Sequence, residues 1–146
     1  GDTFDDARSH VVPALIQRMH AAKEAEAPSV TVWGTGRPRR ELLYVDDLAD
    51  AIAFLLERYS DAAPINVGTG WDLPIAELAQ RIADVVGYRG RLLFDPAMPE
   101  GTPRKCLDVS RLAALGWRAV TPLDDGLRAT YAAFRAADAQ AVPAAP

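Results

Sequence analysis

The chain has 146 residues, of which 49% are hydrophobic, and a formal net charge of -4. This length suffices for one globular domain with its own core. The acidic balance argues against a general nucleic-acid-binding surface, which would need an excess of basic residues on one face. The single cysteine, Cys106, allows no internal disulfide, and no apolar run reaches the about 20 residues of a membrane span. We therefore expect a cytoplasmic protein with neither a nucleic-acid nor a membrane partner.

The first elements are predicted from spacing and turn residues. Residues 1–9 (GDTFDDARS) are polar and carry no initiating Met, so we expect a piece of a longer protein. From Val12 to about Ala25, apolar residues recur at helical spacing, with Pro13 tolerated in the first turn. SVTVW then alternates like a short strand, GTGRPRR is a turn, and ELLYV is predicted to be a second strand.

The middle of the chain predicts two more helices and one more strand. Asp46 or Asp47 is expected to cap a helix whose core face is formed by Leu48, Ala51, Ile52, Leu55 and Leu56. PINVGTG is interpreted as a strand that ends in a glycine turn. Pro74 begins a further amphipathic helix, which Gly87 ends.

The last third predicts a short strand, RLLF, then a loop, PAMPEGTPRK, and a short helix capped by Asp108. A final helix buries Leu123, Leu127, Tyr131 and Phe134. Strands that alternate with helices indicate an α/β domain over residues 1–136. The Ala/Pro-rich tail, residues 137–146, is expected to be disordered.

Basic residues are the first candidates for chemistry. Arg37, Arg39 and Arg40 follow Trp33 in one turn, where guanidinium groups could fork onto phosphate oxygens and the indole could cover a base or a sugar. The alternative is a solvated loop. Arg104 and Lys105 form a second basic pair that could close over the same ligand, with the same alternative.

Other candidates are weaker. His10 and Arg18 could place an acid/base group and a phosphate partner along one side of a cleft, although a histidine near a helix start is more often structural. Positive charge beside Cys106 would favour a thiolate, but packing is the more common role. The GTG turns at Gly34 and Gly68 do not extend to the G-x-G-x-x-G dinucleotide fingerprint, and no metal-ligand motif is present.

Four segments, SHVVPAL, VWGTGRPRRE, INVGTG and GTPRKCLDVSRLAALGW, together resemble the carboxy-terminal half of GDP-L-fucose synthase, an extended short-chain dehydrogenase/reductase. The resemblance implies a small α/β substrate-binding domain without the Rossmann domain. It also implies epimerisation of GDP-4-keto-6-deoxy-mannose at C3 and C5, then reduction at C4 by NADPH. In that family the cofactor fold and most catalytic groups lie in the other half, so we expect this chain alone to bind no cofactor and to be inactive.

Residue by residue, the resemblance implies that His10 is the epimerisation acid. Arg18, Trp33, Arg40 and Lys105 match positions that hold the GDP moiety and the sugar, and Val11 and Leu15 match positions that line the nucleotide pocket. Glu100 stands where the family usually has Asp, so its contact to the nucleotide is less secure. Arg37 and Arg39 are expected to face solvent or to be structural.

Two alternatives stay open. The chain could be a stand-alone GDP-sugar-binding module without chemistry, or the same domain of a related nucleotide-sugar epimerase/reductase. The expected partners are a GDP-sugar and a Rossmann half in cis or in trans. A face made to pack on that half would be exposed, so we also expect self-association into a homo-oligomer.

Overall fold

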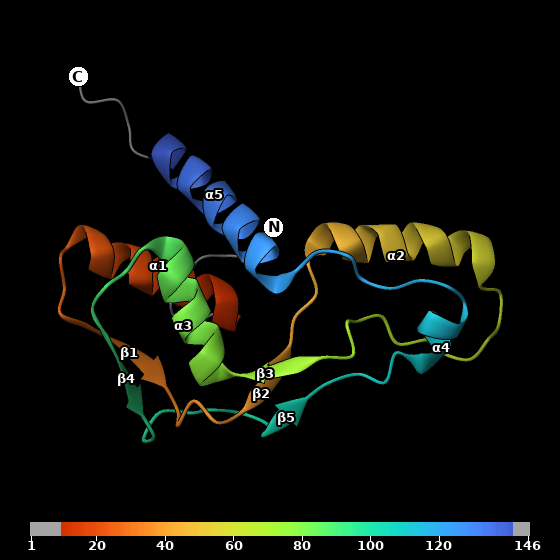
Figure 1. Cartoon of the computed structure of the whole chain (residues 1–146), viewed down its shortest axis with the longest axis horizontal. Coiled ribbons are helices and arrows are strands. Elements are labelled where there is room, and N and C mark those ends of the chain that lie inside the picture. Colours follow the sequence, from red (N-terminus) through yellow and green to blue (C-terminus); the bar gives the residue numbers. More distant parts are fainter. Residues whose placement is uncertain (1–9, 142–146) are drawn as a thin grey trace.

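The computed structural model describes residues 10–141, with side chains up to residue 138. The predicted polar start, residues 1–9, and the end of the predicted tail, residues 142–146, lie outside the described residues. The described chain contains five helices and five short strands, mixed along the sequence, which confirms the expected α/β class (Figure 1).

Two small sheets organise the fold. Strand β1 (Ser29–Trp33) pairs in parallel with β4 (Arg91–Asp95). In the second sheet, β2 (Arg39–Glu41) lies between β3 (Asp72–Pro74), to which it is antiparallel, and β5 (Arg104–Lys105), to which it is parallel. Three segments distant in sequence therefore meet at β2.

The main core lies under three helices, α1 (Val11–Glu24), α3 (Ile75–Val86) and α5 (Leu123–Ala141). Helix α3 buries a continuous stripe, and Gly87 ends it in the left-handed conformation at φ 76°, as predicted. The predicted inward residues Leu127, Tyr131 and Phe134 of α5 are buried in this same cluster. We refer to this part as the packed region; it comprises α1, α3, α5, β1 and β4.

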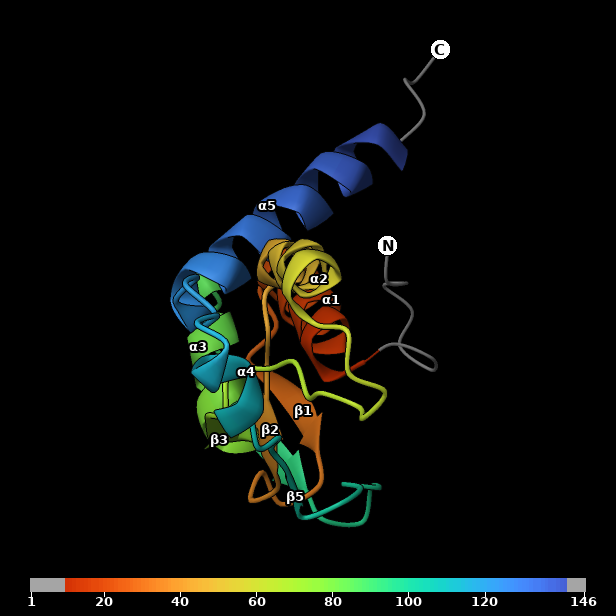
Figure 2. The ribbon, with the colours of Figure 1, turned by 90° about the vertical axis from the view of Figure 1, so that its right-hand side faces the viewer.

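A second, smaller cluster holds α2 (Val45–Arg58) and α4 (Ser110–Ala114) at the other end of the molecule (Figure 1). Its buried members among the described residues are Ala51, Leu112 and Trp117. We call this part, residues 43–71 and 108–121, the thin region. Figure 1 shows α5 beginning near the start of α2 and running away from it, and Figure 2 shows the same helix from the side.

The prediction of the core face of α2 is wrong for three of its five residues. Ala51 is buried, but Leu48, Ile52 and Leu56 are 39%, 50% and 82% exposed. Helical periodicity identifies an apolar stripe but not what covers it. The predicted cap is also wrong: the helix begins at Val45 after Tyr44, and buried Asp47 instead binds residues 120 and 121.

Other boundaries differ for local reasons. The predicted strand ELLYV leaves the sheet at Glu41, because its neighbours β3 and β5 extend no further. Residues 64–67, predicted as a strand, lie in no strand. Strand β3 forms at two residues without a predicted element and at Pro74, which was predicted to begin a helix, and β5 forms in the predicted loop. The final helix continues to Ala141, so residues 137–141 of the predicted disordered tail are helical.

Candidate nucleotide-sugar site

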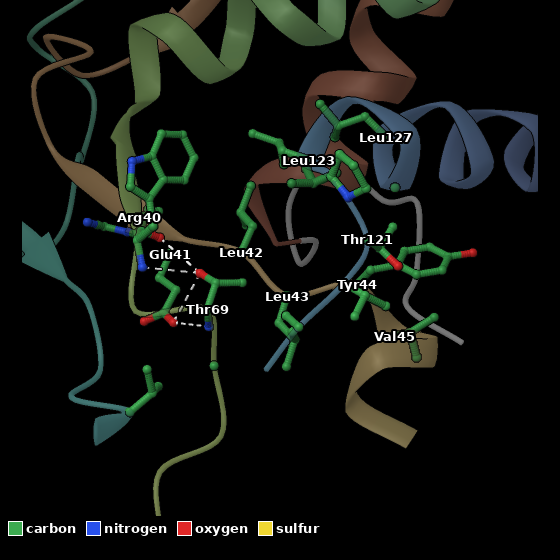
Figure 3. A pocket seen from close by; sticks show the side chains of 18 of the residues that line it. Arg40, Glu41, Leu42, Leu43, Tyr44, Val45, Thr69, Thr121, Leu123 and Leu127 are labelled. Atoms are coloured by element: carbon green, nitrogen blue, oxygen red, sulfur yellow. Dashed lines mark hydrogen bonds between the residues drawn. The ribbon is translucent and has the colours of Figure 1, made fainter. Parts of the chain in front are cut away.

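A pocket of about 1070 Å³ opens between the second sheet, the start of α1 and the start of α5. The segment from Arg40 to Val45 runs along it, with Thr69 beside Glu41 and with Thr121, Leu123 and Leu127 beyond Tyr44 (Figure 3). Arg40 and Lys105 form its cationic end. The apolar end is lined by Val11, Val12, Leu123 and Leu127.

Strand pairing explains why two cations share one end of the pocket. Arg40 and Lys105 are register partners in the parallel β2–β5 pair, and register partners point to the same face of a sheet. The sequence offered the convergence of these two basic segments as a possibility, and the structure brings them together.

The adjacent arginines point the other way, because side chains alternate along a strand. Arg39 and Arg104 each donate from Nε to the carboxylate of Asp72, both at 2.5 Å. Asp72 is buried, and these hydrogen bonds, that of Arg104 first, lower the pKa of its carboxyl below the usual 3.8. Arg39 is therefore structural, as expected, and Arg40 is the arginine of the turn that reaches the pocket.

The Arg40 guanidinium also shapes the loop before β5. Its Nη1 donates to the carbonyl oxygens of Arg39 at 2.8 Å and Thr102 at 2.6 Å, and its Nη2 donates to Glu100 O at 3.3 Å. A planar fork with five donors can keep such contacts and still present N–H groups to an anion.

His10 lies at the apolar end of the pocket. It is exposed and immediately precedes α1, and the neighbouring Val11 packs against the same core cluster as Leu123. The pocket lining thus includes His10, as a titratable group, and the permanent cations Arg40, Lys105 and Arg118.

Four of the eight residues assigned by resemblance line this pocket: His10, Val11, Arg40 and Lys105. The other four are placed elsewhere. Arg18 stacks on Trp33, its Cζ 4.7 Å from the ring centroid, and the Trp33 side chain is 40% exposed. Leu15 is 3% exposed in the main core, and Glu100 accepts from Thr35 N at 2.7 Å and Thr35 Oγ1 at 2.6 Å.

The bonds from Thr35 lower the pKa of Glu100, the side-chain bond having the largest effect. This carboxylate is therefore engaged with the Gly34–Gly36 turn. Cys106 departs from the suggested thiolate: desolvation, with the acidic groups Glu41 and Asp72 nearby, raises the pKa of its thiol.

Several residues that line the pocket were not predicted as site residues from the sequence, among them Glu41, Tyr44, Thr69, Trp71 and Thr121. The sequence indicated Glu41 only weakly, as an acidic residue directly after the two arginines Arg39 and Arg40. Tyr44 and Thr69 lie in a predicted strand and a predicted turn, Thr121 lies at a predicted helix start, and Trp71 has no predicted element; in none of these places does spacing tell which side chain faces a cavity.

Among residues 10–141, no helix combines the length and the apolarity needed to cross a membrane. The model of the NAD dependent epimerase/dehydratase family matches residues 1–68. A probable GDP-L-fucose synthase 1 of Oryza sativa is 50% identical over 130 residues, which cover 89% of this chain and 40% of the relative. The GDP-L-fucose synthase of Escherichia coli is 49% identical over 142 residues, covering 91% of this chain and 44% of the relative.

Among solved structures, a GDP-L-fucose synthetase from Naegleria fowleri bound to NADP superimposes with a TM-score of 0.89 at 24% identity, covering 96% of this chain and 44% of that one. That similarity shows that the α/β fold matches part of such an enzyme. The chain spans about 40% of the length of the curated relatives named here. The chain is thus a homologue of part of GDP-L-fucose synthase, and its first 68 residues match the model of the NAD dependent epimerase/dehydratase family.

Proposed function

We propose that this chain is the substrate-binding, carboxy-terminal portion of an enzyme that epimerises GDP-4-keto-6-deoxy-mannose at C3 and C5 and reduces C4 with NADPH, yielding GDP-L-fucose. One observation carries the proposal: His10, Arg40 and Lys105 line a single pocket. The identity of about half the residues with GDP-L-fucose synthases supports the choice of substrate.

In this proposal the ligand lies along the pocket. Arg40 and Lys105 bind the pyrophosphate, because two adjacent cations match its charge and a guanidinium can bind phosphate oxygens in pairs. The sugar then lies toward the apolar end, where His10 donates a proton to the enolate carbon during epimerisation.

NADPH does not fit the glycine turns in the described residues. A dinucleotide loop leads from a strand into a helix N-terminus, which faces the pyrophosphate. Here the Gly34–Gly36 turn leads from β1 toward β2, and the Gly68–Gly70 turn leads to β3. We assign cofactor binding, and the hydride step with it, to the remainder of the longer enzyme.

Calorimetric titration of this chain with GDP tests the proposal. We expect saturable binding that Arg40→Ala weakens by about tenfold or more, since charge-assisted hydrogen bonds contribute roughly 1.5–3 kcal/mol. Arg89→Ala, which removes an exposed arginine outside the pocket, should leave the affinity unchanged. Failure of the unaltered chain to bind GDP would contradict the proposal.

The same titration addresses the stand-alone module. If this chain binds the GDP-sugar as tightly as the complete E. coli relative does, the module gains support, because no contact from a second half would then be needed. Weaker binding than that of the complete enzyme favours the proposed partial site. Titration with UDP in place of GDP addresses the third alternative, a related enzyme with another base preference.

A further inference from the structure

The carboxylate of Glu41 accepts hydrogen bonds from two other segments of the chain. Its Oε1 accepts from Thr69 N at 2.5 Å, Gly70 N at 2.7 Å and Thr69 Oγ1 at 3.3 Å. Its Oε2 accepts from Leu107 N at 2.6 Å. With β2, on which Glu41 lies, three segments therefore meet at one carboxylate, and Figure 3 shows its contact to Thr69.

Each of these segments contributes to the cationic end of the pocket. Glu41 follows Arg40, Leu107 lies two residues after Lys105, and Thr69 precedes the pocket residue Trp71. A shift of either partner segment relative to β2 would therefore change the spacing of the groups proposed to hold phosphate.

The glycine turn is shaped around this carboxylate. A Cβ at Gly68 would overlap Glu41 Oε1, and Gly70 has φ +72°, a conformation that side chains disfavour. The second GTG motif, which does not fit a dinucleotide, thus acquires a role: its backbone N–H groups at positions 69 and 70 are directed at Glu41.

The sign of the charge makes the role of Glu41 testable. A carboxylate beside two cations weakens their attraction for an anionic ligand, so as a bare charge Glu41 would oppose pyrophosphate binding. Its hydrogen bonds offset this unfavourable charge, because charge-assisted hydrogen bonds are strong and hold the three segments in a fixed arrangement.

We propose that Glu41 is a positioning residue that fastens the Gly68–Gly70 turn and the segment after β5 to β2, and so sets the spacing of the cationic end for a nucleoside diphosphate. This inference rests on the proposed function. Glu41 acts through Arg40 and Lys105, without contact to the reacting atoms.

The test is Glu41→Gln, compared with Glu77→Gln as the matched control. Gln has nearly the same shape but a single acceptor oxygen, so its amide N–H₂ must face either the Leu107 N–H or the Thr69 and Gly70 N–H groups. One link is lost. Glu77 lies on α3, pairs with Arg81 and is outside the pocket, and its substitution removes the same charge.

By calorimetry with GDP and with inorganic pyrophosphate, we expect Glu41→Gln to bind both ligands about tenfold more weakly, despite its more favourable charge. Glu77→Gln should bind both as the unaltered chain does. Hydrogen exchange should be faster at the amides of residues 69 and 70 or of residue 107 in Glu41→Gln, at an unchanged global unfolding midpoint.

The outcomes separate the two proposals. If the unaltered chain binds GDP while Glu41→Gln binds it equally or more tightly, the positioning role is overturned and the proposed function stands. If the unaltered chain binds neither ligand, the proposed function fails and this inference falls with it. Unchanged exchange at all three amides would also overturn the fastening role.

Discussion

The packed region and the thin region are stabilised in different ways. The packed region buries a continuous apolar cluster in which Met19, Leu78, Ala79 and Ile82 are 0% exposed. The buried apolar cluster of the thin region has three residues among those described, and the region also has polar contacts, such as that of Trp117 Nε1, which donates to Asp50 at 2.7 Å. One region thus has a continuous apolar core, while the other leaves a helix face uncovered. The proposed ligand lies along the boundary between them.

The largest expected effect is in the packed region. Leu78→Ala should lower the free energy of unfolding by about 3 kcal/mol, because it opens a cavity under α3. Urea denaturation measures the change. Leu56→Ala, at an 82% exposed position of α2, should change the same quantity by less than about 0.5 kcal/mol. Equal losses in the two variants would show that α2 is covered and would contradict the difference in burial between the two regions.

A polar contact should account for the next largest effect. Asp47 is 6% exposed and accepts from Thr121 N and Thr121 Oγ1, both at 2.9 Å. Asp47→Ala should lower the free energy of unfolding by about 2 kcal/mol, since it removes the charged acceptor of the hydrogen bonds from residues 120 and 121.

The neighbouring exposed Asp46 offers the matched control, and Asp46→Ala should cost less than about 0.5 kcal/mol in the same denaturation experiment. If the two aspartates prove equivalent, the thin region does not depend on the contact of Asp47 to residues 120 and 121.

The buried carboxylate of Asp72 predicts a pH dependence. Its pKa is lowered in the folded state, chiefly by the bond from Arg104 and then by that from Arg39. Its stabilising contribution is therefore complete above the unfolded pKa of about 3.8 and is lost as pH falls through the lower folded value.

Asp72→Asn should flatten this part of the stability profile below about pH 3.8, measured by thermal unfolding at a series of pH values. Half-buried Asp95→Asn is not expected to alter the profile in the same way. If the loss of stability at low pH is the same in Asp72→Asn as in the unaltered chain, the carboxylate of Asp72 does not stabilise the pairing of β2 with β5.

A substitution on the exposed face of α2 should have the smallest effect on stability. It should affect self-association instead. Ile52 is 50% exposed, so Ile52→Glu should change the free energy of unfolding by less than about 0.5 kcal/mol. It should nevertheless reduce self-association, because a charge on an apolar face opposes its burial against another surface.

Sedimentation velocity over a concentration series measures this association. Glu57→Gln, a polar change on the same helix, is the control. If the unaltered chain stays monomeric throughout the series, the expectation of a homo-oligomer through this face is wrong.

Local signals predicted the packed region well. The strand SVTVW, the helix ended by Gly87 and the apolar stripe of α5 were recognisable because the same periodicity that forms each element also buries it. The thin region was predicted less well, because there the periodicity of an element does not tell whether another element covers it. The stripe on α2 has the same periodicity but lacks a neighbour in the described chain, and PINV alternates like a strand without a pairing partner.

The candidate site was predictable only in part. Basic residues in two turns were visible in the sequence, and resemblance selected Arg40 from three arginines. Which arginine faces the pocket depends on the alternation in β2 and on its register with β5, and both are tertiary facts. Glu41 gave little signal, because a carboxylate that accepts from three distant backbone N–H groups leaves no spacing pattern.

The most direct test of the account is an NMR titration of the ¹⁵N-labelled chain with GDP. We predict that the amide resonances of residues 40, 69 and 105 shift with one common dissociation constant, because they surround the cationic end of the pocket. Shifts confined to residues 31–36, around Trp33, would contradict this placement of the ligand. Shifts at none of these positions would contradict the proposed nucleotide-sugar site itself.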